Sequence, residues 1–237
     1  MTNRRPSSAR WLEEHRTDPY VAAARRDGYR SRAAYKLLEL DSSLAARSGG
    51  KGLFRSGDAV IELGAAPGGW TQVATTRVGE RGRVVALDLL PMDPVPGALI
   101  LCGDFLDDAI LELLRAGLGP SGKADVLLSD MAPNMTGFKV ADQGRGSVLV
   151  ETALDFADGI LRPGGRVVLK MFQGPDFHDL VRQARLRFTN VKVEKPPASR
   201  DRSAELYLIG TGFRADPMNS PEDFSDRGMP CESSNRH

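Results

Sequence analysis

The sequence predicts an α/β fold built on a seven-stranded, mostly parallel sheet with an antiparallel last strand. Three observations support this prediction: apolar runs of strand length recur, helical patterns separate most of them, and a glycine-rich turn follows the first run. The chain has 237 residues, of which 41% are hydrophobic, and this is enough for one domain with a sizeable core. The apolar runs span residues 59–63, 83–87, 98–102, 124–129, 166–171, 190–193 and 205–209.

The residues before the first run are predicted to form two helices. Residues 19–26 and 31–41 have helical patterns, and in the second an apolar stripe that includes Leu37 and Leu38 lies beside Lys36. A glycine-rich segment then precedes the sheet. We therefore expect three parts, namely a basic helical extension packed on the main domain, the main domain itself and a disordered polar tail, at residues 1–51, 52–213 and 214–237.

The turn after the first run is the most informative segment. Residues 59–70 read AVIELGAAPGGW, a buried strand followed by a turn and by a helix that begins near Gly69. The glycines of this turn, Gly64 and Gly68 among them, allow the backbone to approach a small molecule closely at the carboxyl end of the strand. Ala66 stands where a dinucleotide fingerprint requires glycine, and no phosphate-binding Gly-Lys-Ser or Gly-Lys-Thr follows. The spacing therefore disfavours a nicotinamide-dependent oxidoreductase and a nucleotide hydrolase.

Polar residues stand where consecutive apolar runs stop. Ligands of parallel sheets lie beyond the carboxyl ends of the strands, so these residues are candidates for binding and catalysis. Asp88 is placed to accept hydrogen bonds from ribose hydroxyls, and Asp104 is placed to accept one from an exocyclic amine of a base. One such aspartate alone is more often a helix cap or a turn residue, but a series at consecutive strand ends indicates a site. The series comprises Asp88, Asp104, Asp130 and Lys170.

Two further residues can reach the same edge of the sheet. Only residues 194–204 separate the last two runs, too few for a crossover helix, so the last strand should enter antiparallel and begin with Glu205 at that edge. Glu205 would then face Asp130 and Lys170. The second predicted helix can bring Lys36 over the edge, although an exposed helical lysine gives the same pattern.

The charges of the chain are segregated although the net charge is only +1. Residues 1–51 hold 11 Lys and Arg against 6 Asp and Glu, and residues 180–203 hold 7 against 2. Basic segments on a near-neutral protein favour a polyanion partner, nucleic acid first, although solvated helix faces give similar counts. Cys102 and Cys231 lack metal-ligand spacing, and no apolar run approaches the length of a membrane span. We therefore expect a protein of the reducing cytosol that holds no metal.

Seven segments, taken together, are specific to one family. They are Ser31–Lys36, Leu63–Trp70, Asp88–Asp93, Gly103–Phe105, Ser129–Asn134, Lys170–Gly174 and Ser199–Glu205. Through them the chain resembles the FtsJ-type 2′-O-ribose methyltransferases that act on large-subunit ribosomal RNA, the bacterial RlmE/RrmJ group. The resemblance runs from about Ser8 to Gly212, and the stretch 8–15 fits the ribosomal members best.

This resemblance implies a Rossmann-like methyltransferase fold with S-adenosylmethionine as the methyl donor. It also implies that residues 52–213 are the catalytic domain and that the target is a uridine in the A-loop of 23S ribosomal RNA, in the large subunit or its assembly particle. We expect a cytoplasmic monomer. The cofactor would contact Gly64, Gly68, Trp70, Asp88, Asp104 and Asp130, and the catalytic set would be Lys36, Asp130, Lys170 and Glu205.

Several alternatives stay open on the sequence alone. Lys170 is the candidate proton acceptor, but lysine is mostly protonated at neutral pH, so a charged Lys170 that only orients the hydroxyl is the rival mechanism. Trp70 and Met131 fit core packing as well as a cofactor pocket. The same fold serves transfer-RNA and cap methyltransferases, and a non-catalytic RNA-binding assembly factor would keep it too. Asn134, rather than an aromatic residue, follows Pro133, which disfavours methylation of a base amine.

Overall fold

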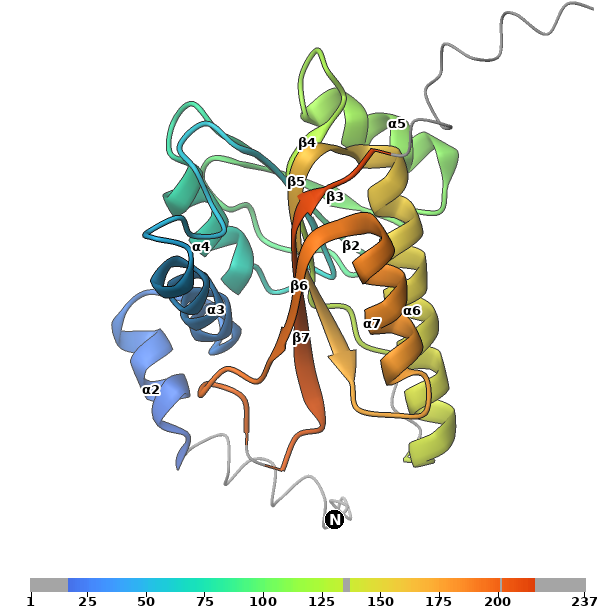
Figure 1. The fold of residues 1–237 in the computed structure, drawn as a ribbon. Coiled ribbons are helices and arrows are strands. Elements are labelled where there is room, and N and C mark those ends of the chain that lie inside the picture. The colour runs from blue at the N-terminus through green and yellow to red at the C-terminus, as the bar shows by residue number, and fades with distance from the viewer. Residues whose placement is uncertain (1–16, 134–136, 201, 216–237) are drawn as a thin grey trace, which may run out of the picture.

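A twisted sheet with helices on both faces forms the centre of the molecule (Figure 1). The computed structural model describes residues 17–133, 137–200 and 202–215. Within these residues the sheet has seven strands: β1 Ala59–Leu63, β2 Arg83–Asp88, β3 Ala98–Cys102, β4 Ala124–Ser129, β5 Leu161–Phe172, β6 Phe188–Glu194 and β7 Glu205–Phe213. Strands β1 to β5 run parallel, whereas β7 is antiparallel to its neighbours β5 and β6. The predicted α/β fold with an antiparallel last strand is confirmed.

The strand order β3-β2-β1-β4-β5-β7-β6 places a topological switch point between β1 and β4. Ligands of open α/β sheets bind at such a point, beyond the carboxyl ends of the strands. The register makes these ends level, because Leu63 at the end of β1 pairs with both Leu87 and Ser129. The antiparallel strand β7 begins at the same edge, where Glu205 pairs with Phe172.

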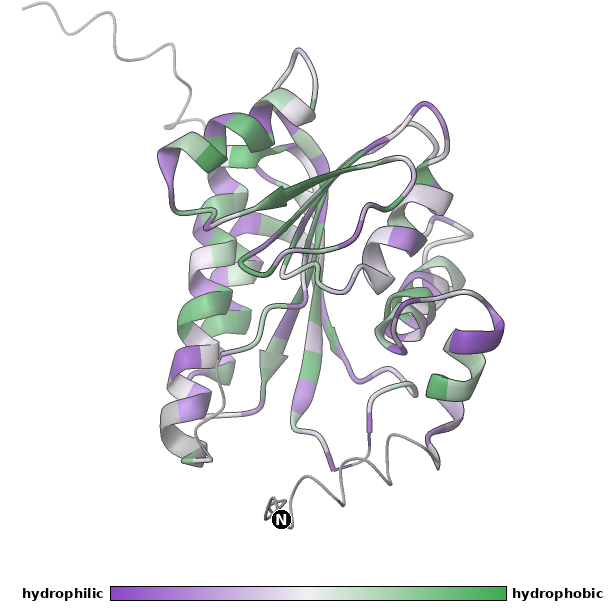
Figure 2. Cartoon of the chain, turned by 180° about the vertical axis from the view of Figure 1, so that it is seen from behind, coloured by the Kyte–Doolittle hydropathy of each residue, from purple (hydrophilic) through white to green (hydrophobic). Residues whose placement is uncertain are grey.

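The helices and the sheet form three layers (Figure 1). Helices α3 and α4 pack on one face of the sheet, with α2 outside them, and α5, α6 and α7 pack on the other face. The helices are α2 Pro19–Arg26, α3 Ala33–Arg47, α4 Gly69–Val78, α5 Asp108–Gly117, α6 Lys139–Ile160 and α7 Phe177–Arg187. Coloured by hydropathy, the strands are the most continuously hydrophobic elements, while the helices show mixed faces (Figure 2). This pattern is what a sheet covered on both faces requires.

Each face of the sheet has its own hydrophobic core. Val60 belongs to the core under α3 and α4, whereas its neighbours Ile61 and Leu63 belong to the core under the other helices. Leu37 of α3 is fully buried in the first core. Helix α3 is therefore fixed against the sheet, and its other side chains have defined positions.

Most boundaries agree with the sequence pattern, and the differences have local reasons. The bounds of α2, β1, β3 and β4 are as predicted, but α3 extends to Arg47 instead of ending at residue 41. Asp41 lies within the longer helix, and its buried carboxylate accepts a hydrogen bond from Leu53 N at 2.7 Å. Strand β5 begins at Leu161, five residues before the predicted start at residue 166. A Pro-Gly-Gly segment interrupts the apolar pattern between these positions, and the pairing with β4 shifts register there.

Other expectations concern parts that the structure does not describe. The stretch 8–15 and the tail from residue 216 lie outside the described residues. Among the described helices, none combines the length and the hydrophobicity that crossing a membrane would require.

Candidate active site

Helix α3 carries Lys36 over the carboxyl edge of the sheet. Its residues Ala34, Leu37 and Leu40 are buried, and this fixes the rotation of the helix. The Lys36 side chain is only 11% exposed, and its Nζ lies 2.6 Å from Glu205 Oε1. The alternative of a solvent-exposed helical lysine is therefore wrong.

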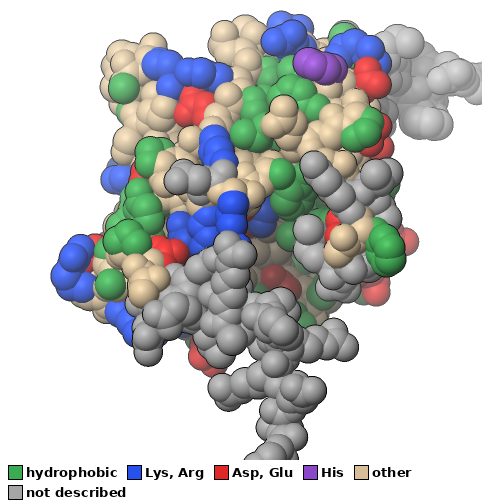
Figure 3. Space-filling model, turned by 90° about the horizontal axis from the view of Figure 1, so that it is seen from below, with side chains coloured by type: hydrophobic (Ala, Val, Ile, Leu, Met, Phe, Trp, Pro, Cys, Tyr) green, Lys and Arg blue, Asp and Glu red, His purple; other side chains and the backbone are tan. Residues whose placement is uncertain are grey.

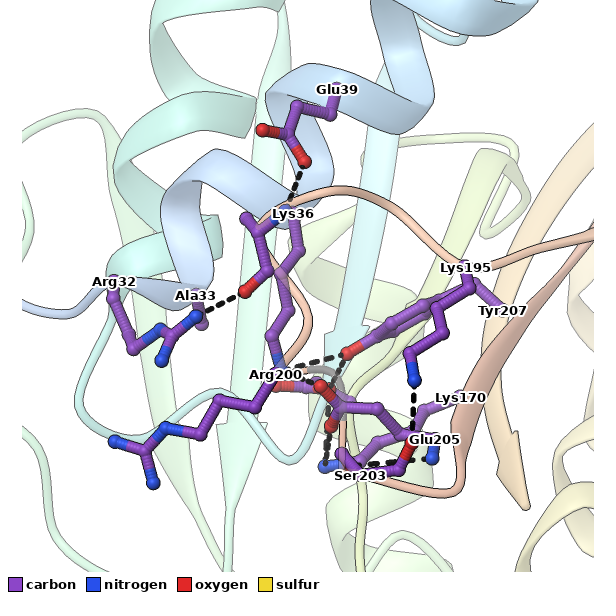
Figure 4. Close-up of polar contacts among 12 residues, drawn as sticks. Arg32, Ala33, Lys36, Glu39, Lys170, Lys195, Arg200, Ser203, Glu205 and Tyr207 are labelled. Carbon is purple, nitrogen blue, oxygen red and sulfur yellow. Dashed lines mark hydrogen bonds and ion pairs between the residues drawn. The ribbon is translucent and has the colours of Figure 1, made fainter. Parts of the chain in front are cut away.

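The four predicted catalytic side chains meet at this edge. Lys170 Nζ lies 3.4 Å from Asp130 Oδ1 and 4.0 Å from Glu205 Oε2, and Lys36 closes the cluster through its ion pair with Glu205. Figure 4 shows Lys36, Lys170 and Glu205 pointing toward one another from a helix and two strands. The cluster contains two cations and two anions, as the sequence pattern predicts.

Tyr207 is a member of the cluster that the sequence analysis missed. Its hydroxyl donates to Asp130 Oδ1 at 3.0 Å and accepts from Lys36 Nζ at 3.3 Å (Figure 4). Tyr207 pairs with Lys170 across β5 and β7, so the two side chains share a face of the sheet. The available signal was strand alternation, because position 207 is two residues after Glu205 and must point the same way.

Charge and burial set the protonation states of two members. Burial raises the pKa of Glu205, but the ion pair and hydrogen bond with Lys36 and the charge of Lys170 outweigh it and hold this pKa below its ordinary value. Burial, together with the charges of Asp130 and Glu205, raises the pKa of Tyr207 well above its ordinary value. Glu205 is thus an anion at neutral pH, and Tyr207 remains a hydroxyl donor.

A cavity of about 440 Å³ lies beside the cluster at the switch point. Its walls are mostly apolar and include Leu87, Leu89, Leu90, Phe105 and Met131. The predicted residue Gly64 lines it too, and its polar members include the predicted residues Asp88, Asp104 and Asp130. Asp130 belongs to both the cavity and the cluster, so a ligand that reaches Asp130 in the cavity comes next to the cluster.

Hydrogen bonds fix the carboxylates of the cavity. Asp88 Oδ2 accepts from Ala66 N and Asp88 Oδ1 accepts from Leu90 N, each at 2.8 Å. Asp104 Oδ1 accepts from Leu106 N at 3.0 Å. Each carboxylate oxygen keeps a second lone pair for a ligand donor. Carboxylates in an otherwise apolar cavity fit a cationic ligand that carries hydroxyl and amine donors.

The turn 64–69 does not work as the sequence analysis proposed. Its amides of Gly64 and Ala65 donate to Leu87 O, and that of Gly68 donates to Ala65 O, so they are not available to a ligand. The glycine at position 64 is needed for another reason, since a Cβ there would lie 2.9 Å from Met131 N. The glycines of the turn therefore permit close contacts within the protein.

Trp70 is a core residue. The residue is 2% exposed, and its indole donates from Nε1 to Ala33 O at 2.7 Å and lies 5.7 Å from the Tyr207 ring. The described residues that line the cavity do not include Gly68 or Trp70. The first backbone bond of α4 runs from Gln72 N to Gly68 O, so the amide of Trp70 is one of the unpaired helix-terminal donors. A contact of Trp70 with a cofactor would have to use this amide.

A second hollow, of about 770 Å³, opens on the other side of the turn. We call it the basic groove, because its lining includes Arg25, Arg30, Arg32, Lys36, Arg200 and Arg202. The space-filling view from below, onto the carboxyl ends of the parallel strands, shows Lys and Arg side chains gathered near the centre of this face (Figure 3). Its residues come from α2, the connection between α2 and α3, α3 itself, the turn before α4 and the connection between β6 and β7, so only the folded chain assembles it.

The groove is held together by ion pairs between distant segments. Arg32 bonds to the Asp18 carboxylate and to Ala198 O, and Arg200 Nη2 lies 3.4 Å from the same Asp18 oxygen. Glu39 accepts from Ala198 N at 2.6 Å. These contacts attach the β6–β7 connection to helix α3 and place it along one wall.

Glu62 is a buried acid below the turn. It is 1% exposed and accepts a hydrogen bond from Thr71 Oγ1 at 2.7 Å. Burial raises the pKa of Glu62 to about 8; the charges of Asp130 and Asp88 also raise it, and the bond from Thr71 opposes them. The group is mostly protonated at neutral pH.

The whole arrangement matches one protein family. Residues 29–213 match the model of the FtsJ-like methyltransferases. The chain belongs to the FtsJ-like methyltransferase family. The match covers α3, every strand described above, the whole cavity and the groove apart from its α2 residues such as Arg25. The predicted family is therefore confirmed over the part that holds the four clustered side chains.

Two curated relatives of this FtsJ-like chain share one name. A protein of Magnetococcus marinus is 58% identical over 214 residues, which are 90% of this chain and 100% of the relative. A protein of Pseudomonas paraeruginosa is 47% identical over 213 residues, 90% of this chain and 99% of the relative. Both are named ribosomal RNA large subunit methyltransferase E.

Solved structures agree with the fold of the FtsJ-like family. A ribosomal RNA methyltransferase of Plasmodium falciparum superposes with a TM-score of 0.68 and 28% identity over 79% of this chain and 100% of its own. Human methyltransferase-like protein 13, solved in complex with S-adenosylhomocysteine, superposes with a TM-score of 0.50 and 15% identity over 76% of this chain and 84% of its own. The second likeness concerns the fold alone.

Proposed function

We propose that this protein transfers a methyl group from S-adenosylmethionine to the 2′-hydroxyl of a ribose in large-subunit ribosomal RNA. The observation that carries the proposal is the meeting of Lys36, Asp130, Lys170 and Glu205 beside the cavity at the switch point. The names of the relatives support the ribosomal substrate. We propose a uridine of the A-loop in 23S ribosomal RNA as the target.

The cavity suits the methyl donor. When bound, S-adenosylmethionine supplies an electrophilic methyl group on a sulfonium, so the oxygen–carbon bond forms as the carbon–sulfur bond breaks. Asp88 and Asp104 would hold the cofactor through hydroxyl and amine donors, and Asp130 would border the reacting end. Gly64 shapes the floor, and the amide of Trp70 is a further donor.

The cluster must align the ribose hydroxyl and help remove its proton. Lys170 is the proposed proton acceptor, and a charged Lys170 that only orients the hydroxyl is the rival. Asp130 and Glu205 hold the ammonium in place, Lys36 holds Glu205, and the Tyr207 hydroxyl holds Asp130. Alignment of the reacting atoms is the larger contribution that these contacts make.

Replacement of Lys170 by arginine separates the two roles. A guanidinium keeps its charge and its donors but cannot lose a proton in a protein. If Lys170 is the base, the wild-type rate depends on an ionisation, and K170R has no single-turnover activity at any pH. If K170R keeps a substantial rate without that pH dependence, Lys170 only orients the hydroxyl.

The basic groove is the proposed RNA surface. Its cations face the phosphates of a strand whose target ribose reaches Lys36 and Glu205, which belong to both the groove and the cluster. Transfer-RNA and cap methylation, and a non-catalytic role in ribosome assembly, remain competing functions.

Methyl incorporation from labelled cofactor distinguishes these functions. We would compare naked 23S ribosomal RNA, isolated large subunits, transfer RNA and capped RNA, and then map the modified ribose. Incorporation into a single A-loop ribose supports the proposal. Incorporation into a base or into another RNA, or binding of large subunits without incorporation, contradicts it.

The proposal extends to the location, the oligomeric state and the domain organisation of the protein. We propose that the protein acts in the cytoplasm as a monomer and without a metal. We also propose that residues 1–51 are a basic extension packed on the catalytic domain, which spans residues 52–213.

A further inference from the structure

The cavity and the basic groove share one wall. Ala66 lines the cavity, and the next residue, Pro67, lines the groove. The turn 64–69 is therefore only one backbone thick between the two hollows. A shift of this turn changes the shape of both.

Arg30 holds this wall from the groove side. Its Nη1 donates to Pro67 O at 3.3 Å and to Asp93 O at 2.6 Å, and its Nη2 donates to Pro94 O at 2.5 Å. Pro67 belongs to the wall, and the other two residues belong to the loop after β2, whose first residues line the cavity. One guanidinium in the groove thus fixes two loops that form the cavity. Hydrogen bonds from a charged donor are about twice as strong as neutral ones.

The backbone around Arg30 is attached to the same structure. Arg30 N donates to Gln72 Oε1 at 2.8 Å, and Gln72 Nε2 donates back to Gly28 O at 2.9 Å, which ties this segment to α4. The fit is tight, because a Cβ at Gly68 would lie 3.0 Å from Arg30 Nη1. The guanidinium therefore packs directly against the wall.

We propose that Arg30 is a positioning residue that couples cofactor binding in the cavity to polyanion binding in the groove. This inference rests on the proposed function for the identity of the two ligands. The guanidinium has five N–H donors, and the three carbonyl contacts leave donors on the groove side for a phosphate. A phosphate there restrains the guanidinium in the orientation that holds the wall, so RNA raises cofactor affinity. By linkage, the cofactor raises RNA affinity by the same factor.

The first test uses the free protein and needs no RNA. The dissociation constant of S-adenosylhomocysteine is measured by titration calorimetry for the wild type, R30Q, R30K and R25Q. Arg25 is a matched control, because it lines the same groove and, among the described residues, bonds to neither loop. We expect R30Q to bind about tenfold more weakly, R30K to be intermediate because one ammonium cannot hold both loops, and R25Q to bind like the wild type. Equal affinity of R30Q and R25Q overturns the positioning role.

The second test repeats the titration with a saturating 23S ribosomal RNA transcript. We expect RNA to lower the wild-type dissociation constant at least about fivefold, within the usual range of coupling between sites. R25Q should bind RNA more weakly but keep this factor, whereas R30Q should lose it. An unchanged dissociation constant in the wild type, or an undiminished factor in R30Q, overturns the coupling.

The two tests also separate this inference from the proposed function. If the wild type binds the transcript but never methylates RNA, the proposed function fails while the coupling is still measured. If the wild type does not bind the transcript at all, the coupling to RNA fails with it. The first test then still decides whether Arg30 positions the cavity wall.

Discussion

The cavity and the basic groove lie on opposite sides of one turn, but they differ in charge and in how the chain builds them. The cavity collects carboxylates that follow successive strands, so its members are set by local sequence at the sheet edge. The groove collects cations from α2, α3, the connection between them and the connection before β7, and ion pairs such as Lys36 with Glu205 join these segments. A cationic cofactor and a polyanionic substrate are each attracted to one hollow and repelled by the other. The opposite charges of the cavity and the groove thus favour binding of each ligand in its own hollow.

The largest expected effect tests whether the cluster between the cavity and the groove acts in methyl transfer without contributing to cofactor affinity. We expect K170A to lower the single-turnover rate of methyl transfer by about 1000-fold, because it removes the proposed proton acceptor. Cofactor affinity should stay within about twofold, since Lys170 is not among the described residues that line the cavity. The matched control is K123A, which removes an exposed lysine that donates to Gly159 O. A large loss of cofactor affinity in K170A would contradict the separation.

The next effect tests the cavity alone. D88A should weaken S-adenosylhomocysteine binding about 10- to 100-fold, because it removes an anionic acceptor and frees the turn at Ala66 and the loop at Leu90. RNA affinity without cofactor should fall much less, because the groove shares only the freed turn with the cavity and keeps its cations. D179A, which removes a surface carboxylate on α7, serves as the control. Equal losses of RNA and cofactor affinity in D88A would show that the two hollows are not separate sites.

A smaller effect concerns the hydrogen bond from Tyr207 to Asp130, the residue that the cavity and the cluster share. Y207F keeps the buried ring but loses the hydroxyl that donates to Asp130, so we expect methyl transfer to fall about tenfold. Because burial and the neighbouring acids raise the pKa of Tyr207, its hydroxyl stays protonated at neutral and mildly alkaline pH. The rate of Y207F should therefore keep the pH profile of the wild type. A profile that loses an ionisation in Y207F would assign the proton acceptor to Tyr207.

The smallest expected effect tests the difference in charge between the cavity and the groove through the salt dependence of binding. RNA affinity should fall steeply with salt, and R25Q should reduce the slope of log K against log salt by about 1. Cofactor affinity should depend much less on salt, since its charges are partly buried in the cavity. A similar slope for both ligands would remove the contrast between the hollows.

The sequence predicted the cavity better than the groove, for a physical reason. Strand ends bring Asp88, Asp104 and Asp130 together through a register that alternation and topology dictate. The same reasoning located Glu205, because a short connection forces an antiparallel strand. The groove depends instead on contacts such as that of Arg32 with Ala198 O, which join segments far apart in the chain and have no local signal.

The turn 64–69 lies beside the cavity as predicted, but its glycines have another role than the one expected. Its glycines were expected to expose amides to a ligand, yet those amides are bonded inside the protein. Trp70 was equally compatible with the pocket and with the core, and the structure places its indole in the core. Sequence alone could not decide, because burial of the first turn of α4 depends on how α3 packs over it.

The buried acid beneath the turn also has a consequence for the energetics of folding. In the unfolded chain Glu62 titrates near its ordinary value of 4.5, whereas burial first, and its acidic neighbours next, raise the pKa in the folded protein to about 8. Between these values the folded state binds more protons at Glu62. The contribution of Glu62 to stability is therefore fully present below the lower value and is lost as pH rises through the upper one. Refolding near neutral pH should therefore take up close to one proton from the buffer. The enthalpy of refolding measured in two buffers with different heats of ionisation should differ accordingly in the wild type, and the part due to Glu62 should be absent in E62Q.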